Sequence, residues 1–501
     1  MRRIADRLFR CGWLPVVLAL ASLGAAERDT RLADAAQAGD IAAVEALLQA
    51  GGDVDLPDRH GTAALHWATY RDDAAMVARL TAAGADVNHA NRYGATPLSL
   101  ACVTANPAIV EPLLDVGAYP NLAAAGEPPL LTCARTGRVD TVELLLAHGA
   151  NPNVTDDWKG QTALMWAVAE DHVAIIDTLV AHGADVNITA TGQTALLFAV
   201  QLGQEASMRT LLAAGADVSV TSPAKQPLTH VAAATDHHQL GPTLLEHGVD
   251  PNARNARGRT TLHAVLEARR LKHQSRRTTP SPESFVFMEQ LITHGAEVDA
   301  RVVTPPKPEA AKPEAADDEE DDADDKPDPA DTYNFIDSQT DLTEATPLLY
   351  AARSGDVDAL RLLLAHGADP LAVTKGGNTA LTLAAGVVFH EGGQGQGEGP
   401  PKADALEAVQ LLLALGCDVN ARNERGQTAL HGAVYRAAND LIRFLVANGA
   451  RTDAEDARGR TPLELAEIGP NQGASRIRRD AAAAVLRELD EHAQTRLQAT
   501  R

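Results

Sequence analysis

The chain has 501 residues, and its 44 Lys and Arg against 67 Asp and Glu give a formal net charge of −23. This acidic balance argues against nucleic acids and anionic membrane surfaces as partners, because both need basic patches. Aromatic residues make up only 3% of the chain although 45% is apolar, so a core has to be built from Ala, Leu and Val. Four cysteines in the whole chain exclude a disulfide scaffold.

Residues 1–26 are predicted to be an export signal. The basic start contains Arg2, Arg3, Arg7 and Arg10. A short apolar stretch follows over residues 14–23, and Gly24 and Ala26 occupy the −3 and −1 positions of a cleavage site. The apolar stretch is shorter than the ~20 residues that a membrane-spanning helix needs. We therefore expect a periplasmic or secreted product with no membrane span after cleavage; an uncleaved N-terminal anchor is the alternative.

After this segment, two phrases alternate along the chain. The first reads Gly-x-Thr-(Ala/Pro)-Leu, and the second reads Leu-Leu-x-x-Gly-Ala-Asp-Val-Asn. The leucine of the first phrase recurs, mostly every 32 to 34 residues, at Leu65, Leu98, Leu130, Leu164, Leu196, Leu228, Leu262, Leu348, Leu381, Leu430 and Leu463. Self-similarity at such a period is typical of repeat architectures.

The pattern resembles the ankyrin repeat, which has a period of 33 and a T-P-L-H-x-A signature. Close copies are Gly-Ala-Thr-Pro-Leu-Ser-Leu-Ala at residues 94–101 and Gly-Gln-Thr-Ala-Leu-His-Gly-Ala at residues 426–433. The resemblance implies an all-α solenoid of about twelve helix-turn-helix units with β-turn fingers and capping helices at both ends. Together with the export signal, it identifies the chain as an exported, bacterial member of this family.

The residues also explain the unit physically. A threonine before proline, as in Thr96-Pro97 and Thr461-Pro462, can cap the first helix while proline occupies its first turn. The second helix is predicted to end at a glycine such as Gly149 in the left-handed conformation. Asp and Asn after this glycine are expected to stabilise the finger turn. Alanine columns let neighbouring helices approach, so that each unit buries its apolar face against the next.

The spacing divides the chain into six segments. These are the export signal (1–26), an N-terminal capping repeat (27–60), ankyrin repeats (61–302), an acidic insertion rich in Pro, Ala, Asp and Glu (303–343), further repeats (344–474) and a C-terminal capping helix (475–501). Terminal units of a repeat array need a polar outer face for solubility.

Three insertions interrupt the period. A basic one near residues 269–283, with Arg269, Arg270, Lys272, Arg276 and Arg277, and a Gly-rich one near 387–402 fall between the two helices of their units. The acidic one falls in a finger and contains the run 317–325. With almost no apolar residues, this segment is predicted to be a disordered, solvated tether. Weak binding of a divalent cation, or docking on the nearby basic insertion, are the alternatives.

Most residues that could act in catalysis or bind a ligand occupy recurring structural positions of the repeat. Eight histidines occupy two recurring positions that the family resemblance assigns to local hydrogen bonds: His66, His148, His182, His247, His263, His294, His366 and His431. The pair His237-His238 has no companion at metal-ligand spacing. Cys102 and Cys133 are expected to be small core residues, with a disulfide as an open alternative. We predict no catalytic residues, cofactor or metal, and no enzyme activity.

The remaining candidates form a surface for a protein partner. Arg92 and Tyr93, and likewise Trp158 and Lys159, are predicted at finger tips, where aromatic rings and basic groups resemble interface hot spots. Trp67 and Trp166 share one column of the first helix, together with Phe198 and Tyr350; partial core packing is the competing interpretation for this column.

These observations favour a non-enzymatic, monomeric scaffold that binds a protein on a concave surface of fingers and first helices. The acidic net charge would steer a basic partner toward it. A regulatory or enzyme-associated accessory factor that uses the acidic insertion and a bound cation is the alternative.

Overall fold

The computed structural model describes residues 31–123, 126–274, 281–303, 342–387, 402–467 and 480–491. The predicted export signal, the acidic run and most of the Gly-rich insertion lie outside these residues. The chain forms two compact units, up to Asn151 and from Pro152 onward, and each is described by itself. Within the described ranges, the regular structure is helical apart from isolated two-residue bridges. No helix there combines the length and the apolar composition that crossing a membrane requires.

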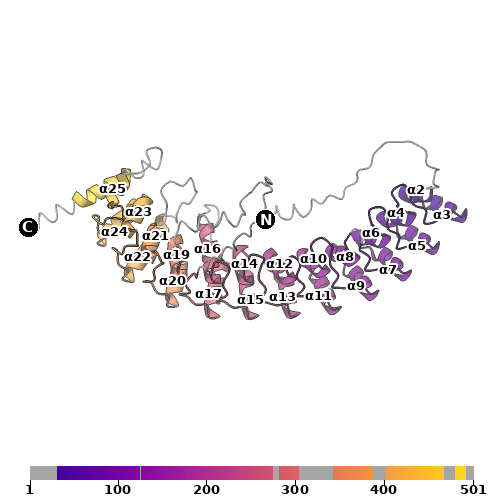
Figure 1. Ribbon diagram of the computed structural model, residues 1–501, viewed down its shortest axis with the longest axis horizontal. Coiled ribbons are helices and arrows are strands. Elements are labelled where there is room, and N and C mark those ends of the chain that lie inside the picture. Colours follow the sequence, from indigo (N-terminus) through magenta and orange to yellow (C-terminus); the bar gives the residue numbers. More distant parts are fainter. Residues whose placement is uncertain are drawn as a thin grey trace, which may run out of the picture. The chain divides into compact units, whose positions relative to one another are not determined.

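The first unit consists of four helix pairs. They are α2 (Arg31–Ala38) with α3 (Ile41–Gln49), α4 (Ala64–Tyr70) with α5 (Ala74–Ala82), α6 (Pro97–Thr104) with α7 (Pro107–Asp115), and α8 (Pro129–Thr136) with α9 (Val139–Ala147). First helices pack on first helices and second helices on second helices, as the two rows of Figure 1 show. The unit is therefore a two-layer stack.

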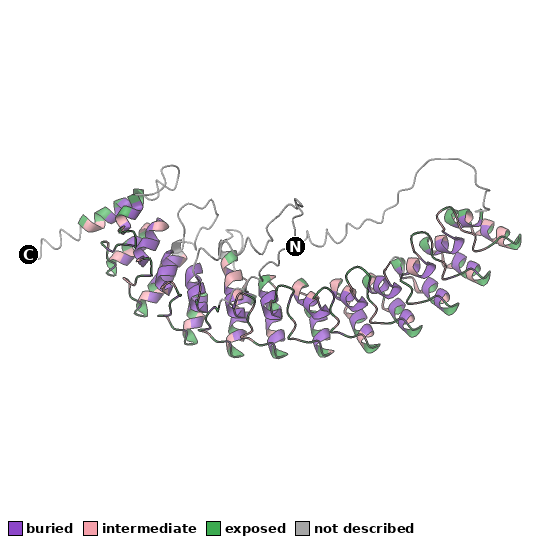
Figure 2. Ribbon diagram, in the orientation of Figure 1, coloured by how far each residue is buried: buried purple, intermediate pink, exposed green. Residues whose placement is uncertain are grey.

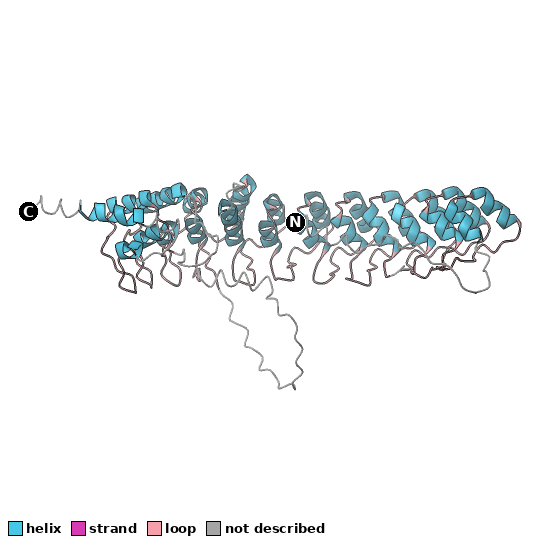
Figure 3. Ribbon diagram, turned by 90° about the horizontal axis from the view of Figure 1, so that it is seen from above, coloured by secondary structure: helices cyan, strands magenta, loops and turns pink. Residues whose placement is uncertain are grey.

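The second unit continues the same architecture. Its pairs are α10 (Ala163–Ala169) with α11 (Val173–Ala181), α12 (Ala195–Leu202) with α13 (Glu205–Ala213), α14 (Leu228–Ala234) with η1 (His238–Leu240) and α15 (Gly241–Glu246), α16 (Thr261–Gln274) with α17 (Pro282–Thr293), α19 (Pro347–Ser354) with α20 (Val357–Ala365), α21 (Ala380–Ala385) with α22 (Lys402–Ala414), and α23 (Ala429–Tyr435) with α24 (Asn439–Ala447). The last helices are α25 (Pro462–Glu467) and one over residues 480–491. In both units the finger loops lie on one side of the helices (Figure 3).

Local hydrogen bonds set the helix ends where the sequence predicts them. The hydroxyl of Thr96 accepts from the N–H of Ser99 at 3.2 Å, and that of Thr461 accepts from the N–H of Glu464 at 3.3 Å. Each cap satisfies one of the N–H groups that a helix start leaves unpaired. At the end of α9, Gly149 has φ +87°, the left-handed conformation expected after the helix.

Small apolar side chains fill the space between successive pairs. Figure 2 shows buried surfaces, in purple, along the stacked helices. Leucines such as Leu98 and Leu130, and alanines such as Ala101, are at most 1% exposed. Phe287 is the largest fully buried side chain of the part described. Its ring occupies the space next to Gly241, where a Cβ atom would lie 2.1 Å from ring carbons. The low aromatic content thus suffices because most helices meet through alanine and leucine.

Asparagine side chains connect successive pairs, a role that the sequence analysis did not assign. Nδ2 of Asn88 donates to the carbonyl of Gly117 at 3.0 Å, and its Oδ1 accepts from the N–H of Tyr119 at 2.8 Å. The same two bonds recur in the second unit, for example from Asn420 to Gly449 and Arg451. The last residue of the Gly-Ala-Asp-Val-Asn phrase therefore fixes the spacing between neighbouring units.

The stack continues without a break across the acidic insertion. Helix α16 packs directly on α19. On the finger side, the N–H of Val302 donates to the carbonyl of Ala345 at 3.1 Å, and the N–H of Glu344 donates to Val302 at 3.2 Å. The two ends of residues 304–341 are therefore held side by side by the array itself.

A buried ion pair lies at the start of the basic insertion. Arg269 lies within α16, which stays helical to Gln274, and is only 5% exposed. Its guanidinium donates to both carboxylate oxygens of Asp356 at 2.6 and 3.0 Å and to Oγ of Ser284 at 2.7 Å. Asp356 also accepts from the N–H of Ala359 at 3.1 Å and so caps α20. Arg269 thus joins three helices.

Removing residues 305–332 should leave the array intact. Loop-closure entropy changes by only about 0.6 kcal/mol per doubling of loop length, and the flanking residues are held by their own hydrogen bonds. We expect the free energy of unfolding, measured with urea by circular dichroism, to change by about 1 kcal/mol or less. A loss of several kcal/mol would show that the deleted residues pack on the array.

Replacing Arg269 should destabilise the second unit strongly. Arg269→Met leaves the carboxylate of Asp356 buried without a cation, for which we expect a loss of about 3–5 kcal/mol in the free energy of unfolding. Arg361→Met is the matched control, because Arg361 forms a largely exposed pair with Glu407, and exposed pairs contribute about 1 kcal/mol or less.

The double variant Arg269→Met with Asp356→Asn separates charge from packing. Asparagine keeps an oxygen that can cap α20 but carries no charge. We expect this variant to recover part of the loss. Equal stability of Arg269→Met and Arg361→Met would contradict the assigned role.

Candidate partner-binding surface

The finger tips before α6 and α10 are each closed by one Asp or Asn side chain. Before α6, Oδ1 of Asn91 accepts from the N–H of Tyr93 at 2.9 Å and from that of Ala95 at 3.0 Å. The backbone N–H of Asn91 donates to the carbonyl of Ala95 at 2.9 Å. Because these bonds satisfy the turn internally, the side chains of Arg92 and Tyr93 are left exposed.

The finger before α10 is built in the same way. Oδ1 of Asp156 accepts from the N–H groups of Trp158 at 2.9 Å and Lys159 at 2.7 Å. Asp156 is 4% exposed, whereas the indole of Trp158 is 64% exposed. All four predicted finger-tip residues therefore lie at exposed tips, Arg92 and Tyr93 on the first unit and Trp158 and Lys159 on the second.

Neighbouring tips are joined by backbone hydrogen bonds. In the first unit, the N–H of Arg92 donates to the carbonyl of His60 at 3.1 Å. In the second unit, the N–H of Glu424 donates to Gly376 at 3.0 Å, and that of Ala457 donates to Arg425 at 2.7 Å. The tips are thus fixed relative to their neighbours. The repeat phrases give no signal for these bonds, since they join residues that vary from unit to unit.

Tyr93 belongs to a patch that spans two fingers of the first unit. Its ring, 55% exposed, stacks on His60 with centroids 6.4 Å apart and planes at 23°. Nε of Arg59 donates to Nε2 of His60 at 3.0 Å. We call Arg59, His60, Arg92 and Tyr93 the first-unit tip patch. It combines ring surface with guanidinium donors on rigid turns.

The first helices of the same unit expose a second apolar area. Trp67 is half-buried in α4 and meets Tyr70 edge-on, with centroids 6.0 Å apart. Tyr70 is 65% exposed, and Val103, at the equivalent position of α6, is 63% exposed. Tyr70 and Val103 are not among the residues predicted from the sequence. Both lie five residues after the leucine of the Gly-x-Thr-(Ala/Pro)-Leu phrase, and this shared position is the sequence signal that could have identified them.

The predicted aromatic column does not form one exposed surface in the second unit. Trp166 and Phe198 are half-buried, but Tyr350 is only 2% exposed. His263 packs edge-on against its ring at 5.0 Å, and the guanidinium of Arg259 lies 5.6 Å from the ring centroid. Tyr350 is therefore a core residue, which agrees with partial core packing, the competing interpretation of this column.

Comparisons with known proteins bear on the identity of these helix pairs. The family model described as "Ankyrin repeats (3 copies)" matches residues 32–124, 130–222 and 402–474. The models "Ankyrin repeats (many copies)" and "Ankyrin repeat" match residues 348–386 and 376–424. Together the matches cover more than half of the chain. The chain belongs to the ankyrin-repeat family.

Curated relatives share this similarity over part of their length. The chain is 35% identical over 122 residues to B-cell lymphoma 3 protein homolog of Mus musculus, which covers 24% of each protein. It is 37% identical over 124 residues to Protein PhlB of Serratia liquefaciens, covering 25% of this chain and 48% of that protein. Ankyrin repeat and SOCS box protein 16 of Mus musculus is 32% identical over 125 residues, 25% of this chain and 26% of that protein. The chain thus spans between about a quarter and half of each of these relatives.

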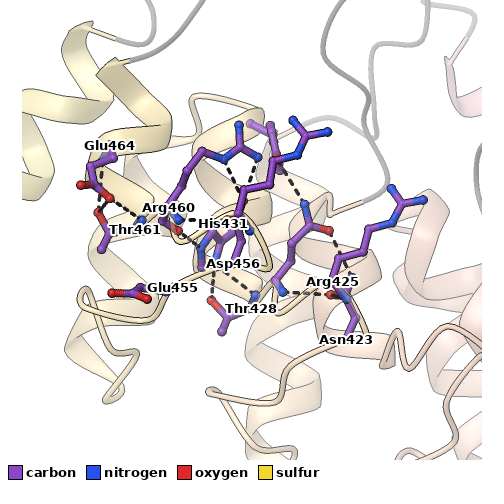
Figure 4. A network of polar contacts seen from close by, with 12 residues as sticks. Asn423, Arg425, Thr428, His431, Glu455, Asp456, Arg460, Thr461 and Glu464 are labelled. Atoms are coloured by element: carbon purple, nitrogen blue, oxygen red, sulfur yellow. Dashed lines mark hydrogen bonds and ion pairs between the residues drawn. The ribbon is translucent and has the colours of Figure 1, made fainter.

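Histidines of the ankyrin signature serve as structural links, which confirms their predicted local role. Nδ1 of His263 accepts from the N–H of Thr260 at 3.3 Å, so the neutral ring carries its proton on Nε2, which donates to the carbonyl of Ala345 at 3.2 Å. His431 makes the same bonds to Thr428 and to the carbonyl of Arg460 (Figure 4). Each ring thus joins its own helix start to the next finger.

Except for His366, the histidines before the closing glycine bond within their helices. In each, Nδ1 lies 2.8 Å from the carbonyl four residues earlier; the residues are His148, His182, His247 and His294. His238 of the His237-His238 pair is buried, with Nε2 at 3.4 Å from a carboxylate oxygen of Asp236. Among the described residues, no group of three or more His, Cys, Asp or Glu is placed to hold a metal ion.

The cysteines of the array are buried thiols. Cys102 of α6 and Cys133 of α8 are both fully buried and are not joined in a disulfide. Burial, with the neighbouring thiol of Cys102, raises the pKa of Cys133. A thiol is nucleophilic only as its thiolate, so this side chain is held in its unreactive form.

Burial of the linking histidines should make stability depend on pH. His230 of α14 is a further link, since its Nε2 lies 2.8 Å from the carbonyl of Arg259 in the next finger. Burial lowers the pKa of His66 and His230 from 6.5 to about 4 and that of His263 to about 3. Between these values and 6.5, the unfolded chain binds a proton that the folded chain does not, so stability falls as pH decreases. Each histidine should contribute a loss of about 2 kcal/mol between about pH 7 and about pH 5.

Urea unfolding of His263→Leu at both pH values tests this expectation. Other units place leucine at this position, as at Leu131 and Leu197. The variant should be less stable at neutral pH but should lose less stability on acidification. A pH dependence equal to that of the unmodified chain would contradict the assignment.

Proposed function

We propose that this ankyrin-repeat chain is a non-enzymatic scaffold that acts after export, as a monomer, by holding a protein partner on its finger tips and first-helix surface. Ankyrin repeats indicate a protein–protein interaction scaffold and are generally not enzymes. The observation that carries the proposal is the exposure of Tyr93 and Trp158 on hydrogen-bonded tips. Large rings held on rigid supports are the side chains that dominate binding energy at interfaces.

Rigid tips favour binding because little conformational freedom remains to be lost. The turn around Tyr93 is closed by Asn91 and joined to the neighbouring tip by the Arg92 to His60 bond. Ordering a mobile side chain at an interface costs about 0.5–1.5 kcal/mol, and a preorganised turn avoids much of the backbone cost. In the second unit, Trp158 and Lys159 are supported in the same way by Asp156.

Structural use of the histidines supports a non-enzymatic role. The rings of His66, His263 and His431 are buried, and both nitrogens of each are used to join helix starts to the next finger. A general base needs a nitrogen within reach of a substrate proton. These side chains are instead parts of the stacking joints.

Export can be tested directly. Expression with residues 1–26 intact, followed by fractionation and N-terminal sequencing, should yield a product that begins after Ala26 in an exported fraction. A cytoplasmic product that keeps these residues would contradict this part of the proposal. The exported chain can then be used as bait, with crosslinking and mass spectrometry to identify the bound protein.

The finger-tip rings should carry a large share of the affinity for that protein. We expect Tyr93→Ala combined with Trp158→Ala to weaken binding by about 2 kcal/mol or more, measured by calorimetry with an unchanged circular dichroism spectrum. The single variants show which unit contributes. Tyr119→Ala is the matched control, since Tyr119 is 63% exposed but lies at the base of a finger. If Tyr93→Ala, Trp158→Ala and Tyr119→Ala weakened binding equally, the result would contradict a binding site at the tips.

A further inference from the structure

Finger tips in the C-terminal part of the second unit carry cations although the chain is acidic. Arg425 and Arg458 occupy equivalent tip positions, Lys375 lies one position earlier in its own tip, and all three are exposed. Within the described ranges, their side chains make no hydrogen bond or ion pair. We call these three residues the tip row. In Figure 4, the guanidinium of Arg425 lies away from the dashed contacts of its finger.

Carboxylates of the same fingers are partly turned inward. Asp456 is 7% exposed and accepts from the guanidinium of Arg460 at 2.7 and 2.9 Å and from two backbone N–H groups. Glu424 and Glu455 remain exposed. Arg422, whose guanidinium donates to the carbonyl of Glu455, adds a cation beside the tip row. The tips therefore display more positive than negative groups.

Backbone bonds make the tip row a fixed surface next to the acidic insertion. The N–H of Lys375 donates to the carbonyl of Thr343 at 2.9 Å, one residue from where the described chain resumes. The N–H of Val303, where it stops, donates to Gly258 at 3.3 Å. Both ends of residues 304–341 thus lie at the finger edge, and one is bonded directly to the tip row.

The intervening sequence supplies the complementary charge. Residues 317–325 read Asp-Asp-Glu-Glu-Asp-Asp-Ala-Asp-Asp. The residues between this run and Leu342 can span roughly 20–25 Å as a flexible coil and about 50 Å when extended. Packed helices lie about 8–10 Å apart, so the tips of three successive units are within reach.

We propose that the acidic run 317–325 docks on the tip row of its own chain. A short flexible tether gives an effective concentration in the millimolar range, so that even weak charge attraction keeps the site occupied. The docking weakens as salt screens the charges.

Two cations of the basic insertion are already paired, and the side chains of Lys272, Arg276 and Arg277 are not among those described. Arg269 is buried in its pair with Asp356, and Arg270 pairs with Glu267 at 2.6 Å. Neither guanidinium is displayed as the tip-row side chains are. The tip row also lies at the edge where the acidic segment begins and ends.

A labelled peptide of residues 313–329 tests the proposal with the full chain. One receptor is the intact chain, and the other has residues 317–325 replaced by Gly and Ser. At about 50 mM salt, fluorescence anisotropy should show binding to the replaced chain and at least tenfold weaker binding to the intact chain, whose own run competes. Binding to the replaced chain should fall steeply as salt is raised.

Charge reversal locates the site. In the replaced chain, Lys375→Glu with Arg425→Glu and Arg458→Glu should weaken peptide binding at least tenfold. The matched control, Arg92→Glu with Lys159→Glu and Lys225→Glu, makes the same change in net charge at exposed tips of other fingers and should weaken it less than threefold. If circular dichroism shows that the first variant is unfolded, the three glutamine substitutions replace it.

Three results would overturn the proposal. The first is equal peptide affinity of the intact and replaced chains, or no binding to either. The second is an equal loss from the control variant, which would indicate attraction by net charge alone. The third is concentration-dependent self-association of the intact chain that the replaced chain lacks, which would place the run on a second copy.

Discussion

Stacking is the constraint on which this molecule depends. A helix pair of two short helices cannot bury its apolar face alone, and it becomes stable only when the next pair covers it. The joints therefore need both close apolar contact and satisfied backbone groups. Alanine and leucine supply the contact, while Asn88 and His263, with their equivalents in other units, pair carbonyl and N–H groups of the following unit. The same few residue types consequently recur at the same register.

This division explains how the array accommodates insertions. An added segment is tolerated where it leaves the stacking faces untouched, as at Val302 and Ala345, whose hydrogen bond closes the base of the acidic insertion. Between α16 and α17 the array accommodates the insertion in a different way. There the first helix is lengthened, and Arg269 takes over the joining of three helices through Asp356 and Ser284. A buried charge pair holds the lengthened unit.

In the fingers, the side chains that close the turn differ from those that are exposed at the tip. Asp and Asn side chains at the start of several tips accept hydrogen bonds from backbone N–H groups, as Asn91, Asp156 and Asp456 show. The residues that follow do not close the turn, and their side chains are exposed. Tyr93, Trp158 and the cations of the tip row are such residues. A chain with a formal charge of −23 can thus present basic and aromatic groups at its finger tips.

The sequence alone determined the repeating unit, because its signals are local: a threonine cap, a glycine in the left-handed conformation and an Asx-closed turn each act within a few residues. Finger tips such as Tyr93 and Trp158 were predictable for the same reason. Tertiary structure decided the rest. Tyr350 is buried because His263 and Arg259, far away in sequence, pack on its ring, and Arg269 meets Asp356 across 87 residues. The tip-to-tip bonds likewise depend on stacking, since only the packed helices bring one finger beside the next.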